Sequence, residues 1–275
     1  MLFRSKYDPS WVIDSIINEL AAIPTLQEIN LNYFENSTQI GNLDAFSNLH
    51  KIRVQVAKFG PDKVILELGK LLSKCPGLTE LDISVDDIEE NMSQLFQCLD
   101  QTGKPLSLSH LGMDGLKVTP NCFKLAIGNL RSLQSLHIHR FSRPWSLRGD
   151  TIWDILRIER VHIQDLSTDC PDKSCLRYLC SFNGLRKLSI MTRGSHHTLN
   201  NPNPILQTVI PHHTESLTEL IMRAASPRLV VVISSETITS VLSPVKNLQY
   251  FALQLVFAGT VDYDSVIVSV FCNDQ

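Results

Sequence analysis

One arrangement of apolar and polar residues, apolar-x-x-apolar-x-apolar, returns along the whole chain. The alternating apolar positions at its end are typical of a half-buried strand. The successive six-residue matches are 23, 29, 30, 25, 25, 27, 32 and 31 residues apart, a mean of about 28. A period of this length indicates a stack of repeated strand-containing units. The matches begin at Leu26, Leu49, Leu78, Leu108, Leu133, Ile158, Leu185, Leu217 and Leu248.

Between these six-residue segments, the apolar residues follow the three-and-four spacing of amphipathic helices. One such stripe follows Pro61, a residue suited to the first turn of a helix. It consists of Val64, Ile65, Leu68, Leu71 and Leu72. Similar stripes begin after Ser10, Asp86–Asp87, Thr119–Pro120, Asp150 and Ser234–Ser235. The sequence therefore predicts that helices and strands alternate from one end of the chain to the other.

Alternating strands and helices also occur in doubly wound sheets and in barrels. The recurrent leucines favour a solenoid, because those folds do not require a repeated six-residue pattern. We therefore expect a curved α/β solenoid of about nine irregular leucine-rich repeats, with parallel strands on the concave face and helices on the convex face. We expect a single domain over 1–275, with repeats over about 10–255 and an irregular C-terminal end over 256–275.

The six-residue pattern resembles that of the leucine-rich repeat superfamily in its ribonuclease-inhibitor-like form. Within it, the chain is similar to the repeat domains of fungal F-box/leucine-rich-repeat proteins. Two features differ from that pattern. Regular repeats carry Asn or Cys three residues after the six, where this chain has residues such as Phe34 and Ala57. An F-box also needs more helical residues than the 25 that precede Leu26, so we expect no F-box here.

Composition and charge narrow the function classes. The chain of 275 residues is 43% hydrophobic and 19% charged, as folded proteins are. Its net charge of −3, with both signs mixed along the length, indicates neither a nucleic-acid nor a membrane partner. The N-terminus does not resemble a secretion signal. The seven scattered cysteines are typical of reduced thiols, so we expect a cytoplasmic or nuclear protein.

Alternate residues of each predicted strand point away from the core. These are the third, fifth and seventh positions of each match, counted from its first residue, and nearly all of them are polar. A row of polar side chains on a rigid sheet suits the recognition of a protein. We therefore expect a monomer that binds a protein through these positions.

The middle repeats carry the most distinctive outward residues. His137 and His162 are predicted to share a column in adjacent repeats, with His110 and His139 close by. Arginine and tryptophan are common anchors of binding interfaces. The full predicted protein-binding set is Glu80, Asp82, His110, His137, His139, Arg140, Arg143, Trp145, Arg160, His162 and Lys187. In the alternative interpretation Trp145 packs onto the solenoid and the histidines are merely solvated.

Catalytic and metal-binding patterns are missing from the sequence. The histidines lack a nearby carboxylate or thiol in the pattern, which disfavours a metal site. The cysteines at 170, 175 and 180 lie at five-residue steps without the pairs of a zinc site. The two histidines in "PHHTES" are predicted to lie in a loop and to be exposed to solvent. No phosphate loop, nucleophile elbow or H-E-x-x-H motif occurs, so we expect no enzyme, cofactor or metal.

Three functions fit these observations. The resemblance implies a non-catalytic module that selects substrates for a ubiquitin ligase. The second is a regulator or inhibitor that binds one enzyme or GTPase stoichiometrically. The third is a truncated paralogue that has no partner of its own and is marginally stable.

Overall fold

A computed structural model describes most of the chain. The described residues are 10–33, 42–56, 61–85, 95–97, 106–116, 118–140, 151–169, 171–192, 204–224, 235–256 and 265–271. The chain divides into two compact units. Unit 1 comprises residues 1–133 and 140–145, and unit 2 comprises residues 134–139 and 146–275.

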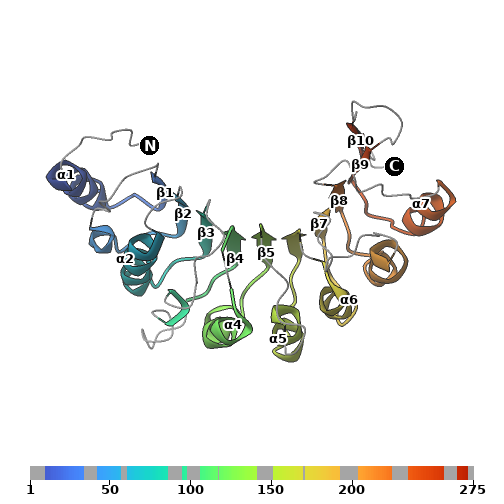
Figure 1. Cartoon of the computed structure of the whole chain (residues 1–275), viewed down its shortest axis with the longest axis horizontal. Coiled ribbons are helices and arrows are strands. Elements are labelled where there is room, and N and C mark those ends of the chain that lie inside the picture. The colour runs from blue at the N-terminus through green and yellow to red at the C-terminus, as the bar shows by residue number, and fades with distance from the viewer. Residues whose placement is uncertain are drawn as a thin grey trace. The chain divides into compact units, whose positions relative to one another are not determined.

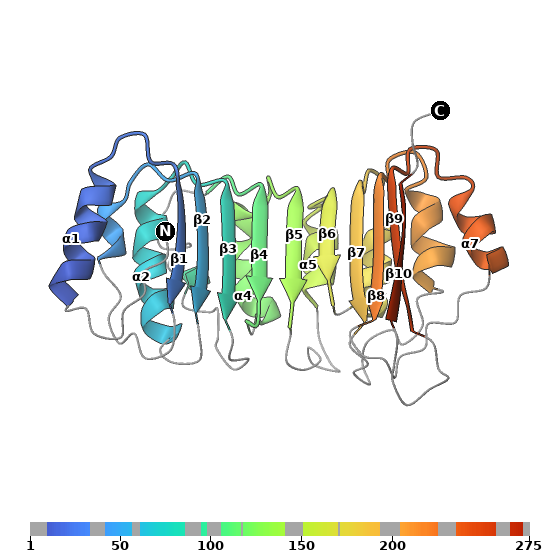
Figure 2. The same ribbon diagram turned by 90° about the horizontal axis from the view of Figure 1, so that it is seen from above.

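The described part of unit 1 contains four parallel strands in sequence order. They are β1 (Glu28–Tyr33), β2 (Lys51–Val56), β3 (Glu80–Val85) and β4 (His110–Asp114). The helical segments are α1 (Ser10–Ala21), η1 (Leu43–Ala45), α2 (Pro61–Lys74), α4 (Pro120–Ala126) and η2 (Ile127–Asn129). Figures 1 and 2 show α2 and α4 on one face of these strands, so the opposite face of the sheet carries no described helix.

Unit 2 contains five parallel strands and one antiparallel strand among its described residues. The parallel strands are β5 (Ser135–His139), β6 (Asp165–Thr168), β7 (Lys187–Thr192), β8 (Glu219–Ala224) and β9 (Tyr250–Val256). Strand β10 (Ser265–Phe271) pairs antiparallel with β9. The helical segments are α5 (Ile152–Ile158), α6 (Lys173–Leu179), η3 (Ile205–Val209), η4 (Ile210–His212) and α7 (Ser235–Leu242). They lie on one face of the strands (Figures 1 and 2).

The alternation of helices with parallel strands confirms the predicted α/β class. Within each unit the strands pair without any offset between the repeats. Glu28, Lys51, Glu80 and His110, the third positions of their repeats, therefore form one row across unit 1. The curvature, the leucine-rich repeat type and the single-domain organisation stay predictions.

The prediction of an irregular C-terminal end does not hold for residues 265–271. These residues, "SVIVSVF", form β10, which pairs antiparallel with β9. The physical reason is that a run of β-branched residues favours an extended backbone. An antiparallel strand closes a parallel sheet without a crossover helix.

The first residue of each interior repeat that starts with leucine belongs to the core, as the pattern predicts. Leu49, Leu78, Leu108, Leu133, Leu185 and Leu217 are all buried. Leu26 and Leu248, in the first and last repeats, are partly exposed. An interior leucine packs against the repeats before and after it, whereas a terminal one has a neighbouring repeat on one side.

Backbone hydrogen bonds link successive repeats where each strand starts. The carbonyl oxygen of Gln27 accepts the N–H groups of both His50 and Lys51, at 2.8 and 3.1 Å. The same two-to-one pattern recurs at the carbonyls of His50 and Thr79 in unit 1. In unit 2 it recurs at Gln134, Gln164, Arg186 and Thr218. These bonds hold each strand start in register with the next.

Side-chain caps fix where three of the helices begin. The Thr119 hydroxyl accepts the Cys122 N–H ahead of α4, as the Thr–Pro pair predicts. Helix α5 begins with a capping box, in which Thr151 and Asp154 satisfy each other's backbone N–H groups. Asp172 caps α6 by accepting the Cys175 N–H.

The predicted sixth strand is misplaced by five residues. The match that begins at Ile158 starts at the last residue of α5. Strand β6 lies within the six residues that begin at Ile163. Arg160 has a left-handed backbone (φ 55°), and Val161 N–H donates to the Leu156 carbonyl at 2.9 Å. This is a Schellman helix end, in which the hydrophobic residue after the left-handed one packs inward. Ile158 is accordingly 60% exposed, whereas Ile163 is fully buried.

A buried histidine joins two repeats in the core of unit 2. His213 is 1% exposed, so the prediction of a solvated loop histidine is wrong for this residue. Its Nδ1 accepts the Leu185 N–H at 3.4 Å, and its Nε2 lies 3.0 Å from the Leu179 carbonyl oxygen, to which it donates. Burial lowers the pKa of the His213 ring below the ordinary value of 6.5. The neutral ring therefore connects the end of α6 to the start of the next repeat.

An aromatic cluster surrounds this histidine. Phe182 stacks on His162 with ring centres 5.1 Å apart and lies 5.5 Å from His213. Tyr178 packs against Phe182 and donates its hydroxyl to the Val161 carbonyl at 2.8 Å. The same hydroxyl accepts the Ile163 N–H at 3.2 Å. Tyr178 thus ties the end of α5 to the start of the sixth repeat.

Two further findings concern the cysteines and membranes. Among the described cysteines, Cys75, Cys122 and Cys175 are buried and Cys180 is partly exposed, and all four are free thiols. In the part of the chain that the structure describes, no helix has the length and apolar character needed to cross a bilayer.

Candidate functional site

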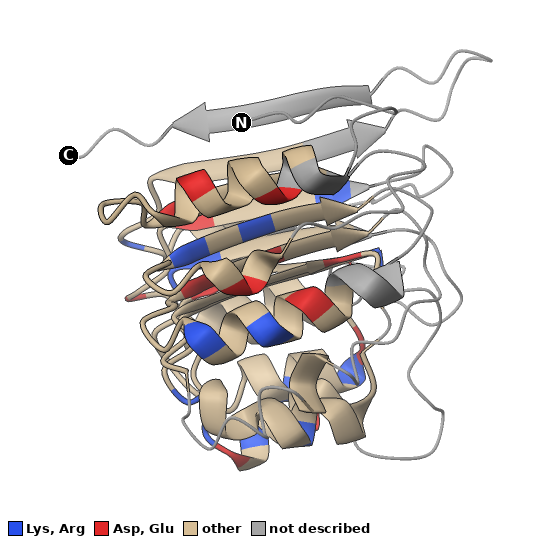
Figure 3. Ribbon diagram, turned by 90° about the vertical axis from the view of Figure 1, so that its left-hand side faces the viewer, with Lys and Arg blue, Asp and Glu red and all other residues tan. Residues whose placement is uncertain are grey.

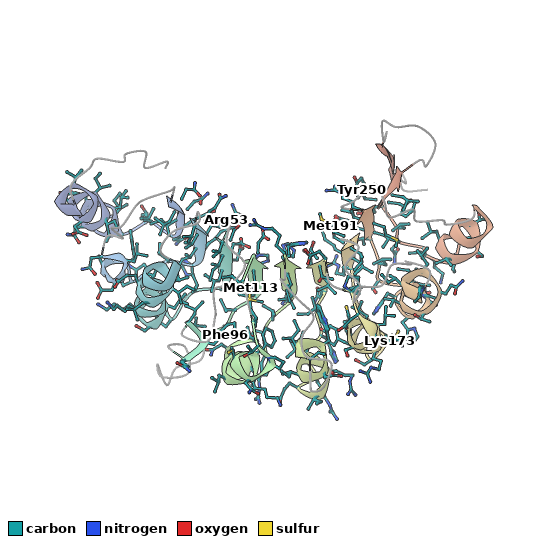
Figure 4. The ribbon with its side chains drawn as sticks, viewed as in Figure 1. Arg53, Phe96, Met113, Lys173, Met191 and Tyr250 are labelled. Carbon is teal, nitrogen blue, oxygen red and sulfur yellow. The ribbon has the colours of Figure 1, made fainter. Side chains whose placement is uncertain are left out.

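The outward positions of the strands form the candidate surface. In unit 1 the burial of β2 and β3 alternates, with Ile52, Val54 and Val56 buried and the residues between them more exposed. Figure 4 shows Arg53 projecting from the side of the strands opposite the helices. We call this side of each unit its polar face, defined by the third, fifth and seventh positions of the repeats.

Charged residues of alternating sign cross the polar face of unit 1. Arg53 lies 3.7 Å from Glu28 on one side and 3.3 Å from Asp82 on the other. Asp82 accepts a hydrogen bond at 2.8 Å from Nε2 of His110 on the next strand. Lys51 forms an ion pair with Glu80. Viewed end-on in Figure 3, residues of both charges are visible on the strands.

Asp82 occupies the centre of this charge row. Burial alone raises the pKa of the Asp82 carboxyl, but hydrogen bonds and charges from His110 and Arg53 outweigh burial and lower it. Gly112 lies opposite Asp82 in the sheet register. A Cβ at Gly112 would overlap Asp82 Oδ1, so the carboxylate of Asp82 fits here because residue 112 has no side chain.

A second group of contacts lies at the seventh position. Arg140 Nε donates to Asp114 Oδ1 at 2.6 Å, and its Nη2 donates to Ser84 Oγ at 3.1 Å. The backbone of Arg140 is left-handed, with φ 53°. Arg140 directly follows the seventh position of its repeat, and its guanidinium is held by residues of β3 and β4.

The polar face of unit 2 brings a serine, a histidine and an aspartate together. Ser135 Oγ lies 3.3 Å from Nε2 of His137, and Asp165 Oδ1 lies 3.6 Å from the same nitrogen. A catalytic triad requires the acid on Nδ1 and the nucleophile on Nε2. Here both groups approach one nitrogen, and Ser135 Oγ also donates directly to Asp165 Oδ2 at 3.3 Å. His139 Nε2 is similarly held, 2.9 Å from Ser167 Oγ.

The structure corrects two predicted site residues and one inference about the histidines. Arg160 and His162 lie in the turn between α5 and β6, so neither shares a column with His137. Instead, Asp165, Ser167 and Asp169 take the outward positions, although Asp169 is fully buried. His110 and His137 each have a carboxylate neighbour, Asp82 and Asp165, contrary to the sequence inference. Even so, the described residues contain no group of three that could hold a metal ion.

The remaining predicted residues fall into two groups. Glu80, Asp82, His110, His137, His139 and Lys187 lie on strands at outward positions. Lys187 pairs with Glu219 at 2.7 Å, and the hydrogen bond to Glu219 raises the pKa of its ammonium group. Arg143 and Trp145 lie outside the described residues.

Three outward residues of unit 2 were not selected by sequence reasoning. Met191, Ile221 and Tyr250 are apolar or aromatic residues at positions where most repeats have a polar one. The signal was present in the sequence, because an apolar residue at an outward strand position breaks the alternation.

Comparisons with known proteins do not identify the chain. A scan against protein-family models matched none of them, and a search of curated proteins gave no match.

Proposed function

We propose that this chain is a non-catalytic protein-binding module of the leucine-rich repeat superfamily, in its ribonuclease-inhibitor-like form. The offset-free register of the strands and the two-to-one carbonyl bonds support a repeat architecture of this kind. The period of about 28 residues, after the sixth repeat is moved to Ile163, fits the same superfamily.

The observation that carries the proposal is the polar face of each unit. It consists of side chains on regular strands, and many of these side chains are held by neighbours on the adjacent strand. Such a surface is rigid, so a partner that binds it orders few side chains. In the serine–histidine–aspartate cluster of unit 2, Ser135 and Asp165 contact each other and the same nitrogen of His137, an arrangement that differs from that of a catalytic triad.

The resemblance to F-box/leucine-rich-repeat proteins suggests a setting for this activity. In that setting the bound protein is a substrate that a ubiquitin ligase modifies. A stoichiometric regulator of one enzyme would form an equally tight complex, but the amount of its partner would not depend on ubiquitination. The abundance of the captured partner with and without an inhibitor of ubiquitin activation therefore separates the two settings.

A capture experiment with matched variants tests the proposal. Asn30 and Gln55 are exposed outward residues of unit 1, and Ser189 is a partly exposed one in unit 2. Substitution of these residues by arginine adds bulk to the polar face and leaves the ion pairs and hydrogen bonds described above in place. We expect Asn30→Arg/Gln55→Arg or Ser189→Arg to reduce capture of a partner from cell extract by about tenfold or more.

The controls are Gln97→Arg, in the short helical stretch 95–97, and Gln207→Arg, in η3, which add the same side chain at exposed residues. Both controls should capture as much partner as the unaltered chain. Loss of capture in the controls, with full capture by the polar-face variants, would place the interface elsewhere and overturn the proposal.

A further inference from the structure

The turn between α6 and β7 contains a reactive pair of residues. Asn183 is followed by Gly184, and this is the one Asn–Gly dipeptide in the sequence. Residues 180–186 join Leu179, at the end of α6, to Lys187, at the start of β7 (Figure 1). Asn–Gly is a common turn sequence. It is also the context in which asparagine loses its side-chain amide most readily, because glycine has no side chain to hinder its own backbone nitrogen.

Both reacting groups are accessible in the folded chain. Asn183 is exposed, and Gly184 is partly exposed. Among the residues that the structure describes, neither the Asn183 carboxamide nor the Gly184 N–H has a hydrogen-bond partner. A Cβ placed on Gly184 would have no atom within 4 Å. The fold therefore leaves open space in which the Gly184 nitrogen can approach the carboxamide carbon.

The path of the main chain favours glycine at position 184. Its φ is 103°, a conformation that residues with a side chain rarely adopt. The residues on either side of the pair are buried, Phe182 at 6% exposure and Leu185 completely. The chain thus turns between two side chains that are anchored in the core. The reactive dipeptide follows from the way in which α6 is joined to β7.

We propose that Asn183 is a site of spontaneous deamidation in the folded protein. The Gly184 nitrogen forms a bond to Asn183 Cγ, and the side-chain amide leaves as ammonia with the proton of the Gly184 N–H. Water then opens the cyclic imide. Attack at Cγ breaks the Cγ–N bond and gives aspartate. Attack at the α-carbonyl carbon breaks the original peptide bond and gives isoaspartate, in which the main chain runs through Cγ.

Isoaspartate at position 183 acts on a junction between repeats. It adds one atom to the main chain between Phe182 and Leu185. The Leu185 N–H donates to His213 at 3.4 Å, and the Ser216 hydroxyl donates to the Leu185 carbonyl at 2.8 Å. The ring of Phe182 lies 5.5 Å from that of His213. A longer main chain moves Phe182 and Leu185 apart, so we expect the isoaspartyl form to weaken these contacts.

Incubation of the full chain in mildly alkaline buffer, followed by peptide mapping with mass spectrometry, tests the site. Asn247 is the internal control, since it is also exposed and lies in the turn before β9. It precedes Leu248, and its carboxamide donates to the Glu215 carbonyl at 2.6 Å. Asn183 should deamidate faster than Asn247 by about tenfold or more. An intact Asn183, or equal rates at the two asparagines, would overturn the proposal.

The same measurement in urea tests the claim that the fold leaves both groups accessible. Asn183 should deamidate in buffer at a rate similar to its rate in the unfolded chain. In both cases the rate should be lower in mildly acidic buffer, because the attacking nitrogen must lose its proton. Deamidation of Asn183 in urea alone would mean that the folded turn protects it, and the proposal would be wrong.

A variant at the same position identifies the source of any new charge. Deamidation adds one negative charge, so ion-exchange chromatography separates the products from the unaltered chain. Asn183→Gln should stay a single species during the incubation, because a longer side chain forms the larger cyclic imide slowly. If Asn183→Gln becomes as heterogeneous as the unaltered chain, another residue carries the reaction.

The effect on the junction is measured on the separated products. The isoaspartyl fraction should melt at a lower temperature than the unaltered chain, and its Leu185 amide should exchange with solvent faster. Asn183→Asp carries the same added charge on a normal main chain. It should match the unaltered chain in both measurements. Equal losses in Asn183→Asp and in the isoaspartyl fraction would attribute the effect to charge and contradict the main-chain explanation.

This inference is independent of the proposed function. It concerns the turn between a helix and a strand of unit 2, and its measurements require no binding partner. Loss of partner capture in the controls of the capture experiment would therefore leave it standing, and an unreactive Asn183 would leave the polar face as the proposed binding surface.

Discussion

Asp82 lies over Gly112, and the carboxylate occupies the space that a side chain at position 112 would fill. The two residues are directly opposite in adjacent strands of unit 1. Gly112 therefore allows the Asp82 carboxylate to reach His110, which lies two residues before Gly112 on the same strand. Gly112 has no side chain, and the space this leaves allows Asp82 to connect His110 with Arg53 on this face.

Alanine at position 112 should disturb this arrangement. A Cβ there would overlap Asp82 Oδ1 and lie 3.0 Å from its Cγ, so the carboxylate must move away from His110. We expect Gly112→Ala to lower the free energy of unfolding by about 1–3 kcal/mol in urea denaturation.

The matched control is Gly128→Ala, since a Cβ at Gly128 has no atom within 4 Å. Gly128 lies in η2, where alanine should be neutral or slightly stabilising. Equal losses for the two variants would mean that Asp82 does not depend on the space at Gly112.

The pH dependence of stability should report on His213. Because burial lowers the pKa of the folded state below 6.5, the unfolded chain takes up a proton more readily than the folded one. The stability that the neutral ring contributes is therefore fully present above 6.5 and is lost as pH falls through the folded pKa. The free energy of unfolding, measured in urea between about pH 7.5 and pH 5.5, should fall towards the acid end.

Replacement of His213 isolates its part in this change. His213→Asn should be less stable than the unaltered chain at about pH 7.5, by about 1–3 kcal/mol, because it disturbs two buried hydrogen bonds. Its stability should vary less with pH than that of the unaltered chain. A variant whose pH dependence matches that of the unaltered chain would show that other groups are responsible.

The helix end at Arg160 offers a stabilising substitution. Arg160 has φ 55°, a conformation that glycine adopts without the steric cost that other residues incur. Arg160→Gly should therefore raise the free energy of unfolding by about 0.5–1 kcal/mol. Arg157→Gly, three residues earlier within α5, should lower it by about 1 kcal/mol. If both variants are destabilised to the same extent, residue 160 does not end the helix in this way.

The Tyr178 hydroxyl should contribute to stability through its two buried hydrogen bonds. Tyr178→Phe keeps the ring contacts with Trp153 and Phe182 but leaves the Val161 carbonyl and the Ile163 N–H without their partner. We expect a loss of about 1–3 kcal/mol in the free energy of unfolding. Phe182→Leu serves as a comparison that alters packing without changing a hydrogen bond. A Tyr178→Phe variant as stable as the unaltered chain would mean that water replaces the hydroxyl.

The sequence predicted the strands well where the leucines and the alternation agree, as at Leu78 and Leu217. It failed at the sixth repeat, because the helix end Ile158–Val161–Ile163 matches the apolar pattern better than Ile163–Leu166–Thr168 does. Threonine ends the true strand segment, and Thr168 is nevertheless fully buried. The left-handed backbone of Arg160 is also difficult to predict, because glycine is the usual residue at a helix end of this kind.

The candidate site was predictable as a face but not in its details. Outward positions follow from the alternation, so Asp82, His137 and Lys187 were placed on the correct side of their strands. Their partners depend on the register between strands, which one sequence does not reveal. The role of His213 also could not be predicted, because its burial depends on Leu179 and Leu185, which lie 34 and 28 residues earlier.

Site-specific photo-crosslinking tests directly whether the polar face binds a protein. A photoreactive amino acid is placed at Gln55 or Ser189 on the polar face, and at Gln97 or Gln207 on the helical segments, and each protein is irradiated in cell extract. We expect one protein adduct that forms at the polar-face positions and not at the helical ones. An adduct that forms at the helical positions alone would contradict it.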